Sequence, residues 1–314
     1  MKLLDEILPT VEKPSRYIGG EWGEDKPVPA ELNYCICFPD VYEVGMSNLG
    51  IKIVAEAVKS VKGTSVDRCF APWPDFGEAL RKNDIPLYSL GMKKSLAEFD
   101  MIGFSLQYEM SFTAVLYMLD LAGIPLKAKD RGDEYPIVQA GGPCMCNPEP
   151  MADFFDLFTI GDGEEVMAQI AELKLKFKDK KTFLKEAAKL QGVYVPAFMD
   201  VEYDENGKIA GFKGITKVTK ALVRDLDKAV FPEKFGVAST EAVFDRAIIE
   251  VARGCYRSCR FCQAGFLYRP VRPRSVETLT KQACSIVRNG GYPELSLNSL
   301  STGDYPELSK LLDS

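Results

Sequence analysis

Short apolar runs, each followed by a glycine-bearing loop and then a helical stretch, recur from about residue 33 to residue 178. Runs that are apolar throughout are typical of parallel strands buried between two layers of helices. We therefore expect an α/β, doubly wound, Rossmann-like domain over residues 29–178. The expected strands are 34–38, 66–70, 101–106, 137–140 and 157–160, and the expected helices between them include 49–61, 75–82 and 112–121.

The segments on either side of this domain have different patterns. Residues 1–28 are charged and interrupted by glycine and proline, which favours an irregular lead-in. Residues 179–242 are expected to form a helix and a small β connector, because alternating residues surround an Asn-Gly dipeptide at 206–207. Residues 243–314 begin a second α/β unit, with a strand from 247, a cysteine-rich loop, a helix capped by Ser275 and a strand near 295.

The composition excludes several classes of chemistry and partner. The chain has no histidine, which excludes imidazole bases and imidazole metal ligands. Its 39 Lys and Arg against 45 Asp and Glu give a net charge of −6, so no general field attracts nucleic acid or an anionic membrane. Nine cysteines, no apolar leader and no long apolar span indicate a cytoplasmic protein with reduced thiols and no membrane partner.

Three cysteines, Cys255, Cys259 and Cys262, form a C-x3-C-x2-C cluster in the loop after the expected strand at 247. Thiolates are the protein ligands of iron–sulfur clusters, and a short loop can bring three of them to one cluster. Three ligands leave one iron of a four-iron cluster open, and an open metal position can bind a substrate or cofactor. A structural zinc site is the alternative, and it needs a fourth ligand, for which Cys284 is the nearby candidate.

The residues around these cysteines resemble the radical S-adenosylmethionine (SAM) superfamily. The resemblance rests on Arg253-Gly254 before the cluster, Phe261 before the third cysteine and residues 263–272 after it. With residues 38–50 and 141–150, the chain looks like the N-terminal part of an uncharacterised bacterial family of radical SAM proteins that has an N-terminal cobalamin-binding-type domain.

This resemblance implies a chemistry and a set of ligands. The three cysteines would hold a [4Fe-4S] cluster whose open iron binds SAM and whose electron cleaves it to a 5'-deoxyadenosyl radical, which attacks an unknown substrate. An electron donor such as flavodoxin or ferredoxin would reduce the cluster. Phe261 would pack beside the adenine, and Asn298, Ser299 and Ser301 lie where superfamily members contact the SAM amino group, without the usual Gly-Gly-Glu sequence.

Cobalamin is the second cofactor that the resemblance suggests. Typical cobalamin domains carry Asp-x-His-x-x-Gly after the first strand, and here Asp40, Tyr42 and Gly45 occupy the three positions. A neutral phenol is a poor cobalt ligand, so a bound cobalamin would lack a protein imidazole. The glycines after two later strands either bring backbone amides to this ligand or serve as tight turns; they are Gly141, Gly142, Gly161 and Gly163.

Other cysteines and arginines have two interpretations. The pair at 35 and 37 reads as packing within one strand, whereas the pair at 144 and 146 either packs a loop or lines a pocket. The arginines after the cysteine cluster form either a solvated basic face or a clamp for a carboxylate or phosphate; they are Arg269, Arg272 and Arg274.

The segment from residue 243 is short for a radical SAM core. A barrel uses about 30 residues per βα unit, so a six-unit partial barrel needs about 190. We expect only the first units of a partial (β/α)6 radical SAM barrel, completed by a longer chain, by a second polypeptide, or not at all. Two functions therefore remain open: a radical SAM enzyme of unknown substrate, or a non-catalytic or truncated cobalamin-type/iron–sulfur binding module.

Overall fold

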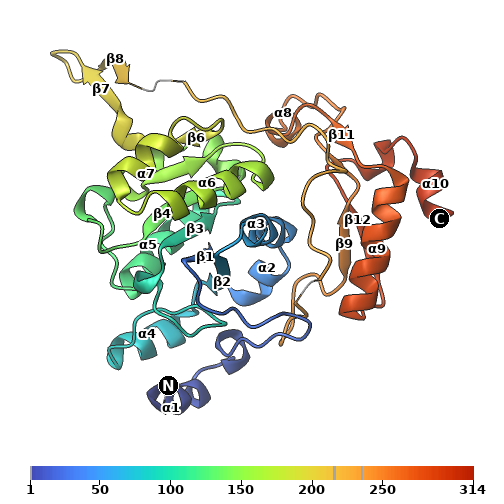
Figure 1. The fold of residues 1–314 in the computed structure, drawn as a ribbon, viewed down its shortest axis with the longest axis horizontal. Helices are drawn as coiled ribbons and strands as arrows, with labels where there is room; N and C mark the ends of the chain where they lie inside the picture. The colour runs from blue at the N-terminus through green and yellow to red at the C-terminus, as the bar shows by residue number, and fades with distance from the viewer. Residues whose placement is uncertain (1, 215–216, 235) are drawn as a thin grey trace.

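The computed structural model describes residues 2–214, 217–234 and 236–314; residues 1, 215, 216 and 235, which fall in the expected lead-in and connector, lie outside the described residues. A six-stranded sheet forms the centre of the N-terminal domain (Figure 1). Its order is β2-β1-β3-β4-β5-β6, and only β6 is antiparallel to its neighbour. The strands are β1 (Leu32–Phe38), β2 (Thr64–Phe70), β3 (Met101–Ser105), β4 (Ile137–Gly141), β5 (Leu157–Thr159) and β6 (Val193–Tyr194).

Helices cover both faces of this sheet, because alternate residues of each strand point to opposite sides. Cys35 and Cys37 of β1 are buried in the core beneath α4 (Pro74–Lys82) and α5 (Phe112–Leu121). Tyr34 and Ile36 point to the other core, against α2 (Tyr42–Met46), α3 (Leu49–Lys59), α6 (Glu164–Lys176) and α7 (Lys180–Ala187). The mixed α/β fold with a parallel sheet thus confirms the sequence-based prediction.

The N-terminal segment is more helical than expected. It forms α1 (Lys2–Ile7) and two 3-10 turns, η1 (Leu8–Thr10) and η2 (Pro14–Tyr17). Leu4, Ile7 and Val11 recur at helical spacing and are buried in the core that includes α4. The glycines and prolines that suggested an irregular segment interrupt this pattern without preventing the first helix. Further 3-10 turns are η3 (Leu96–Glu98), η4 (Glu109–Ser111), η5 (Ala128–Asp130), η6 (Pro143–Cys146) and η7 (Glu149–Phe154).

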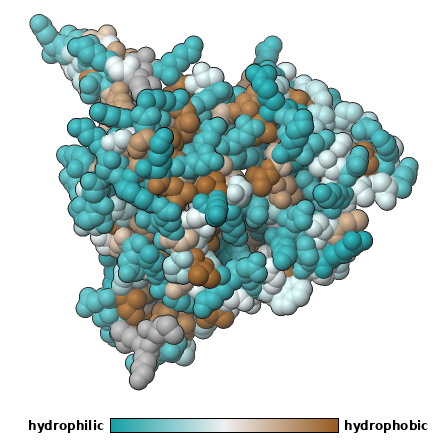
Figure 2. Space-filling view, viewed as in Figure 1, coloured by the Kyte–Doolittle hydropathy of each residue, from teal (hydrophilic) through white to brown (hydrophobic). Residues whose placement is uncertain are grey.

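The connector contains the expected hairpin, followed by residues 217–234 and 236–242, which run along the N-terminal domain and which we call the strap. After the 3-10 turn η8 (Pro196–Phe198), β7 (Met199–Tyr203) and β8 (Ile209–Gly214) pair antiparallel and project from the body (Figure 1). Farther along, Ala221 bridges to Gly161, and Val237 bridges to Trp22. On the face drawn in Figure 2, hydrophilic side chains predominate and hydrophobic groups form separate patches.

The C-terminal segment packs against α3 of the N-terminal domain (Figure 1). Strands β9 (Ala247–Glu250) and β12 (Leu295–Asn298) are parallel and joined through α9 (Val276–Gly290), whose N-terminus Ser275 caps. Leu49 and Ile53 of α3 belong to the same buried core as β9 and α9. The remaining elements are β10 (Ala252–Arg253), α8 (Ala264–Leu267), β11 (Arg272–Pro273), the 3-10 turn η9 (Thr302–Asp304) and α10 (Leu308–Leu312).

In the segment where we expect the first units of a partial barrel, the structure has two parallel strands, β9 and β12. Within the described residues, β12 pairs with no strand other than β9. A search of the same residues finds no helix that is both long and apolar enough to span a membrane.

Candidate functional site

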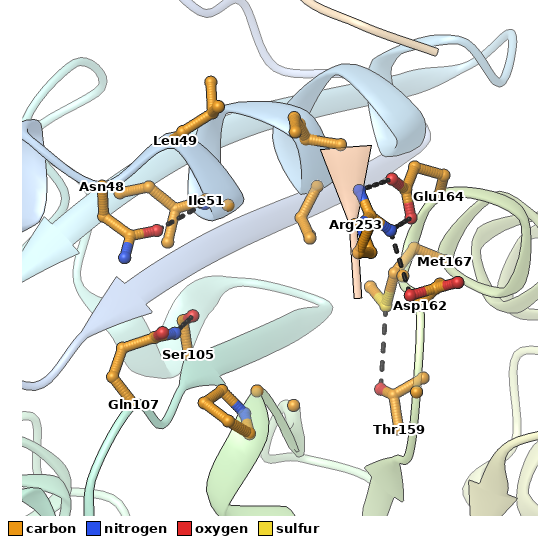
Figure 3. Close-up of a pocket in the computed structure, with 18 of the residues that line it drawn as sticks. Asn48, Leu49, Ile51, Ser105, Gln107, Thr159, Asp162, Glu164, Met167 and Arg253 are labelled. Carbon is orange, nitrogen blue, oxygen red and sulfur yellow. Dashed lines mark hydrogen bonds and ion pairs between the residues drawn. The ribbon is translucent and has the colours of Figure 1, made fainter. Parts of the chain in front are cut away.

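A cavity of about 390 Å³ lies between the carboxyl ends of the central strands and the C-terminal segment (Figure 3). Residues of β1, β3, β4 and β5 line one side, α3 and α6 flank it, and residues 252–254 and 298–300 lie opposite. Doubly wound domains bind ligands outside the carboxyl ends of their strands, and cavities of this size suit small molecules. The topology and the cavity therefore indicate the same candidate site.

Uncharged polar side chains face this cavity from the ends of several strands. The Gln139 amide donates a hydrogen bond to Thr159 Oγ1 over 2.6 Å. The Gln107 amide donates to Ser105 Oγ over 2.8 Å (Figure 3). Burial raises the pKa of Tyr34, which keeps its phenol neutral. The groups on this side are thus amides and hydroxyls, which suit an uncharged polar ligand.

The other wall of the cavity is charged but internally compensated. Arg253 Nη1 lies 3.0 Å from Asp162 Oδ1, and Nη2 lies 2.6 Å from Glu164 Oε1 (Figure 3). Arg253 Nε lies 2.9 Å from Glu250 Oε1. Burial acts to raise the pKa of Asp162, but Arg253 and Arg272 outweigh it and hold that pKa below its ordinary value. Asp162 therefore stays ionised, and all three carboxylates are paired with Arg253.

The predicted glycines line the cavity, and two of them also meet a strict backbone requirement. Gly142 and Gly161 have φ values of 108° and 106°, and an added Cβ would collide with the backbone oxygen of Leu106 or of Ala221. Gly141 and Gly163 have more room, with the nearest atoms 3.6 and 3.2 Å from an added Cβ. Tight turn geometry thus accounts for two of the four glycines.

The three cluster cysteines stand on the loop between β10 and α8. All three thiols are free; Cys259 is exposed, and Cys255 and Cys262 are partly exposed. Gly254, at φ 93°, starts the loop against the carbonyl oxygens of residues 268 and 270. Three accessible thiols on one loop are the donor set that an iron–sulfur cluster requires, so the residues fit that group chemically. Among the described residues, no three Cys, Asp or Glu side chains are already grouped to hold a metal ion.

The structure brings some of the predicted residues together and places others elsewhere. Phe261 is 93% exposed, and Ser301 lies in a smaller hollow beside Cys255, where its hydroxyl donates to Asp304. Asp40 lies outside the cavity and accepts a hydrogen bond from the Tyr108 hydroxyl. The predicted residues that share the cavity at the carboxyl ends of the strands are Gly141, Gly142, Gly161, Gly163, Asn298 and Ser299.

Tyr42 and Gly45 also lie outside the cavity. The Tyr42 hydroxyl donates to Glu21 over 3.0 Å and accepts from the Ser239 amide over 2.9 Å. Burial raises the pKa of Tyr42 to about 12. Gly45 packs so closely on Phe70 that a Cβ would overlap the ring. The position where a cobalamin domain has its histidine is therefore turned toward the lead-in and the strap.

The prediction of a solvated basic face is wrong for Arg272 and Arg274. Both side chains are buried, and they pair with Asp162 and Glu250, respectively. The opposite charges of these carboxylates make the burial possible, so neither arginine is free to clamp a ligand. Arg269 is partly exposed and donates to Ser258 Oγ over 3.0 Å.

Most of the polar residues that line the cavity were not predicted as site residues from the sequence. A buried glutamine within the otherwise apolar run 137–140 is the signal that could have identified Gln139. The two cysteines at 144 and 146 differ in their surroundings. Cys144 is buried, and burial raises its pKa to about 11. Cys146 is exposed, and its Sγ lies 3.3 Å from the side-chain amide of Gln263. The missed cavity residues are Ser105, Gln107, Gln139, Thr159, Asp162, Glu164 and Arg253.

Comparisons with known proteins show what parts of this chain are similar to. Residues 50–196 match a family model described as radical SAM proteins, N-terminal. An uncharacterized protein of Methanocaldococcus jannaschii is 26% identical over 297 residues, which cover 90% of this chain and 52% of that protein.

The fold is similar to that of a solved enzyme. The radical SAM methyltransferase TsrM from Kitasatospora setae, with tryptophan substrate and a SAM analogue bound, matches with a TM-score of 0.50 at 11% identity, over 90% of this chain and 50% of TsrM. A TsrM structure with cobalamin and a [4Fe-4S] cluster matches over the same shares with a TM-score of 0.49. The chain thus spans about half the length of these relatives.

Proposed function

We propose that this chain is a radical SAM enzyme that binds a [4Fe-4S] cluster through Cys255, Cys259 and Cys262 and acts with SAM on a substrate still to be identified. The match of residues 50–196 to a model of radical SAM proteins and the fold similarity to TsrM support this proposal. One observation carries the proposal: three free, accessible thiols share a loop whose first residues line the cavity. A cluster held there would supply the single electron that cleaves SAM to a 5'-deoxyadenosyl radical.

The chain's own residues support SAM binding beside that loop. Ser299 lines both the cavity at the carboxyl ends of the strands and the smaller hollow that contains Cys255. Asn298, at the end of β12, adds an amide to the cavity wall. Both are uncharged hydrogen-bonding groups, suited to orient the amino and carboxylate groups of SAM. Of the predicted SAM contacts, these two have the geometry that favours the role, and Phe261 and Ser301 remain predictions.

The test is anaerobic reconstitution with iron and sulfide, followed by electron paramagnetic resonance (EPR) of the reduced protein with and without SAM. We expect about four irons per chain and a spectrum that SAM changes. Cys259→Ala should lose the cluster, whereas Cys284→Ala, an exposed thiol on α9, should keep it. A cluster retained after all three loop cysteines are replaced by alanine, or a spectrum indifferent to SAM, would contradict the proposal.

Cobalamin binding is a second candidate, favoured by the amides and hydroxyls at the carboxyl edge of the doubly wound sheet. Because Tyr42 faces Glu21 and Ser239, the chain would bind cobalamin without a side-chain ligand from this position. The test is the absorbance spectrum of protein purified from cells supplied with cobalamin. A corrin spectrum supports the candidate, and its absence at saturating cobalamin removes it.

A non-catalytic binding module is the rival to an enzyme. Incubation with SAM and dithionite, or with flavodoxin or ferredoxin as electron donor, discriminates the two. Sustained 5'-deoxyadenosine favours the enzyme, and none from an intact cluster favours the module. The relatives are about twice as long, so the same assay should be repeated with additional downstream sequence or a second polypeptide, since either could supply further barrel strands.

A further inference from the structure

Arg253 connects the cysteine loop to the N-terminal domain through an ion-pair cluster of opposite charges. We call its members, Arg253, Asp162, Glu164 and Glu250, the junction cluster. Arg253 contacts all three carboxylates, of which Asp162 and Glu164 come from the loop after β5 and the start of α6. Their side chains are 12%, 8%, 3% and 14% exposed, so water screens these pairs weakly.

Both ends of this connection are fixed by the backbone. Asp162 follows Gly161, whose neighbour Ile160 accepts a hydrogen bond from the Ala221 amide, and Asp162 itself accepts from the Val223 amide. On the other side, Arg253 immediately precedes Gly254 and then Cys255. The backbone of Arg253 in β10 also pairs with that of Arg272 in β11, and this pairing fixes the Arg253 backbone. A displacement of either end must therefore disturb the other.

The junction cluster also lines the cavity, so a molecule bound there lies against it (Figure 3). A guanidinium makes several hydrogen bonds in a fixed planar geometry, which a lysine cannot reproduce. Arg253 uses this geometry to donate to Glu164 from both terminal nitrogens and to Glu250 from Nε and Nη2, while Nη1 also contacts Asp162. These contacts therefore fix the position of the Arg253 side chain and also balance its charge.

We propose that Arg253 is a positioning residue. Through the junction cluster it fixes the cysteine loop relative to the cavity, so that the three cysteines, the ligands of the proposed iron–sulfur cluster, keep a fixed position relative to the molecule that the cavity binds. This inference rests on the proposed function for its purpose, although the mechanical connection exists in the cluster-free chain. The residue does not act on reacting atoms. It acts through Asp162 and Glu164 on one side and through Gly254 on the other.

The first test uses the cluster-free protein, so it does not depend on the proposed function. Amide hydrogen exchange is measured for residues 247–275 in wild type, Arg253→Lys and Asp162→Asn. We expect exchange about tenfold faster in both variants, because each loses part of the junction cluster. Strand β1 serves as the internal control for folding, and Arg81→Lys, which alters an exposed pair with Asp120, is the matched control variant. Unchanged exchange of 247–275 in Arg253→Lys, with β1 intact, overturns the proposal.

The second test uses the reconstituted protein and reads a property other than turnover. The SAM concentration that gives half of the EPR change should rise about tenfold in Arg253→Lys, with iron content equal to wild type. The same half-point in the variant and wild type overturns a positioning role. If wild type takes up no cluster, the proposed function fails, and the exchange experiment alone decides the inference.

Discussion

Tyr42 lies where the resemblance to cobalamin domains would place a cobalt-ligating histidine, but its hydroxyl serves the protein's own structure. It donates to Glu21 in the lead-in and accepts from the Ser239 amide in the strap. Its ring also lies edge-on to Phe70, with centroids 5.4 Å apart. These contacts fasten two long irregular segments to α2, so the tyrosine has a structural reason to be there.

Tyr42→Phe should therefore destabilise the fold and leave cofactor content unchanged. Removal of the hydroxyl leaves the Glu21 carboxylate and the Ser239 amide each short of a partner, which typically costs about 1–3 kcal/mol. Urea unfolding measures the loss, and absorbance of the purified protein measures cobalamin. Tyr203→Phe, in the exposed hairpin, is the control and should change neither. A variant of normal stability that loses bound cobalamin would show that the hydroxyl faces the cofactor instead.

Among the elements, strands and helices with strong local patterns could be predicted from the sequence. The helix from residue 276 is an example: Ser275 accepts a hydrogen bond from the Thr278 amide, which confirms the expected cap. Gly291 ends the helix in a left-handed conformation. Helix α1 was missed because its apolar spacing is short and lies close to prolines and glycines. The burial of Arg274 could not be predicted, because its partner Glu250 is distant in sequence and the pairing depends on tertiary packing.

The loop after β5 offers a test of backbone geometry between two elements. Gly161→Ala should cost about 1–3 kcal/mol, because φ is 106° and the new Cβ would meet the Ala221 backbone oxygen in the strap. Gly163→Ala is the matched control: its φ is −88°, the nearest atom is Val54 Cγ2 at 3.2 Å, and the expected cost is below about 1 kcal/mol. Urea unfolding of both variants gives the comparison. Equal costs would show that the strap yields to the added methyl.

At the scale of the whole molecule, the two α/β parts are held together by both apolar and ionic contacts. Leu49 and Ile53 of α3 enter the core of β9 and α9, and the junction cluster adds buried ion pairs beside them. The cavity lies between the same parts, so its shape depends on how they dock. Sequence patterns identified each part and the cysteine loop, but they could not show the interface, because its charged partners come from segments far apart in the chain.

The ion pairs of this interface should weaken at low pH, and the pKa of Asp162 indicates the pH range. Its pKa in the folded protein lies below the ordinary aspartate value of about 3.9, since Arg253 and Arg272 stabilise the ionised form. A group of this kind contributes its full stabilisation above the unfolded pKa and loses it as pH falls through the folded pKa.

Asp162→Asn should therefore lower the free energy of unfolding by about 3 kcal/mol near pH 7, as expected for breaking a buried pair. The difference from wild type should shrink as pH falls below about 4. This difference is measured from the unfolding free energies of wild type and Asp162→Asn between pH 7 and pH 3. A difference that stays constant across this range would mean that the Asp162 charge does not stabilise the fold and that the variant acts through packing alone.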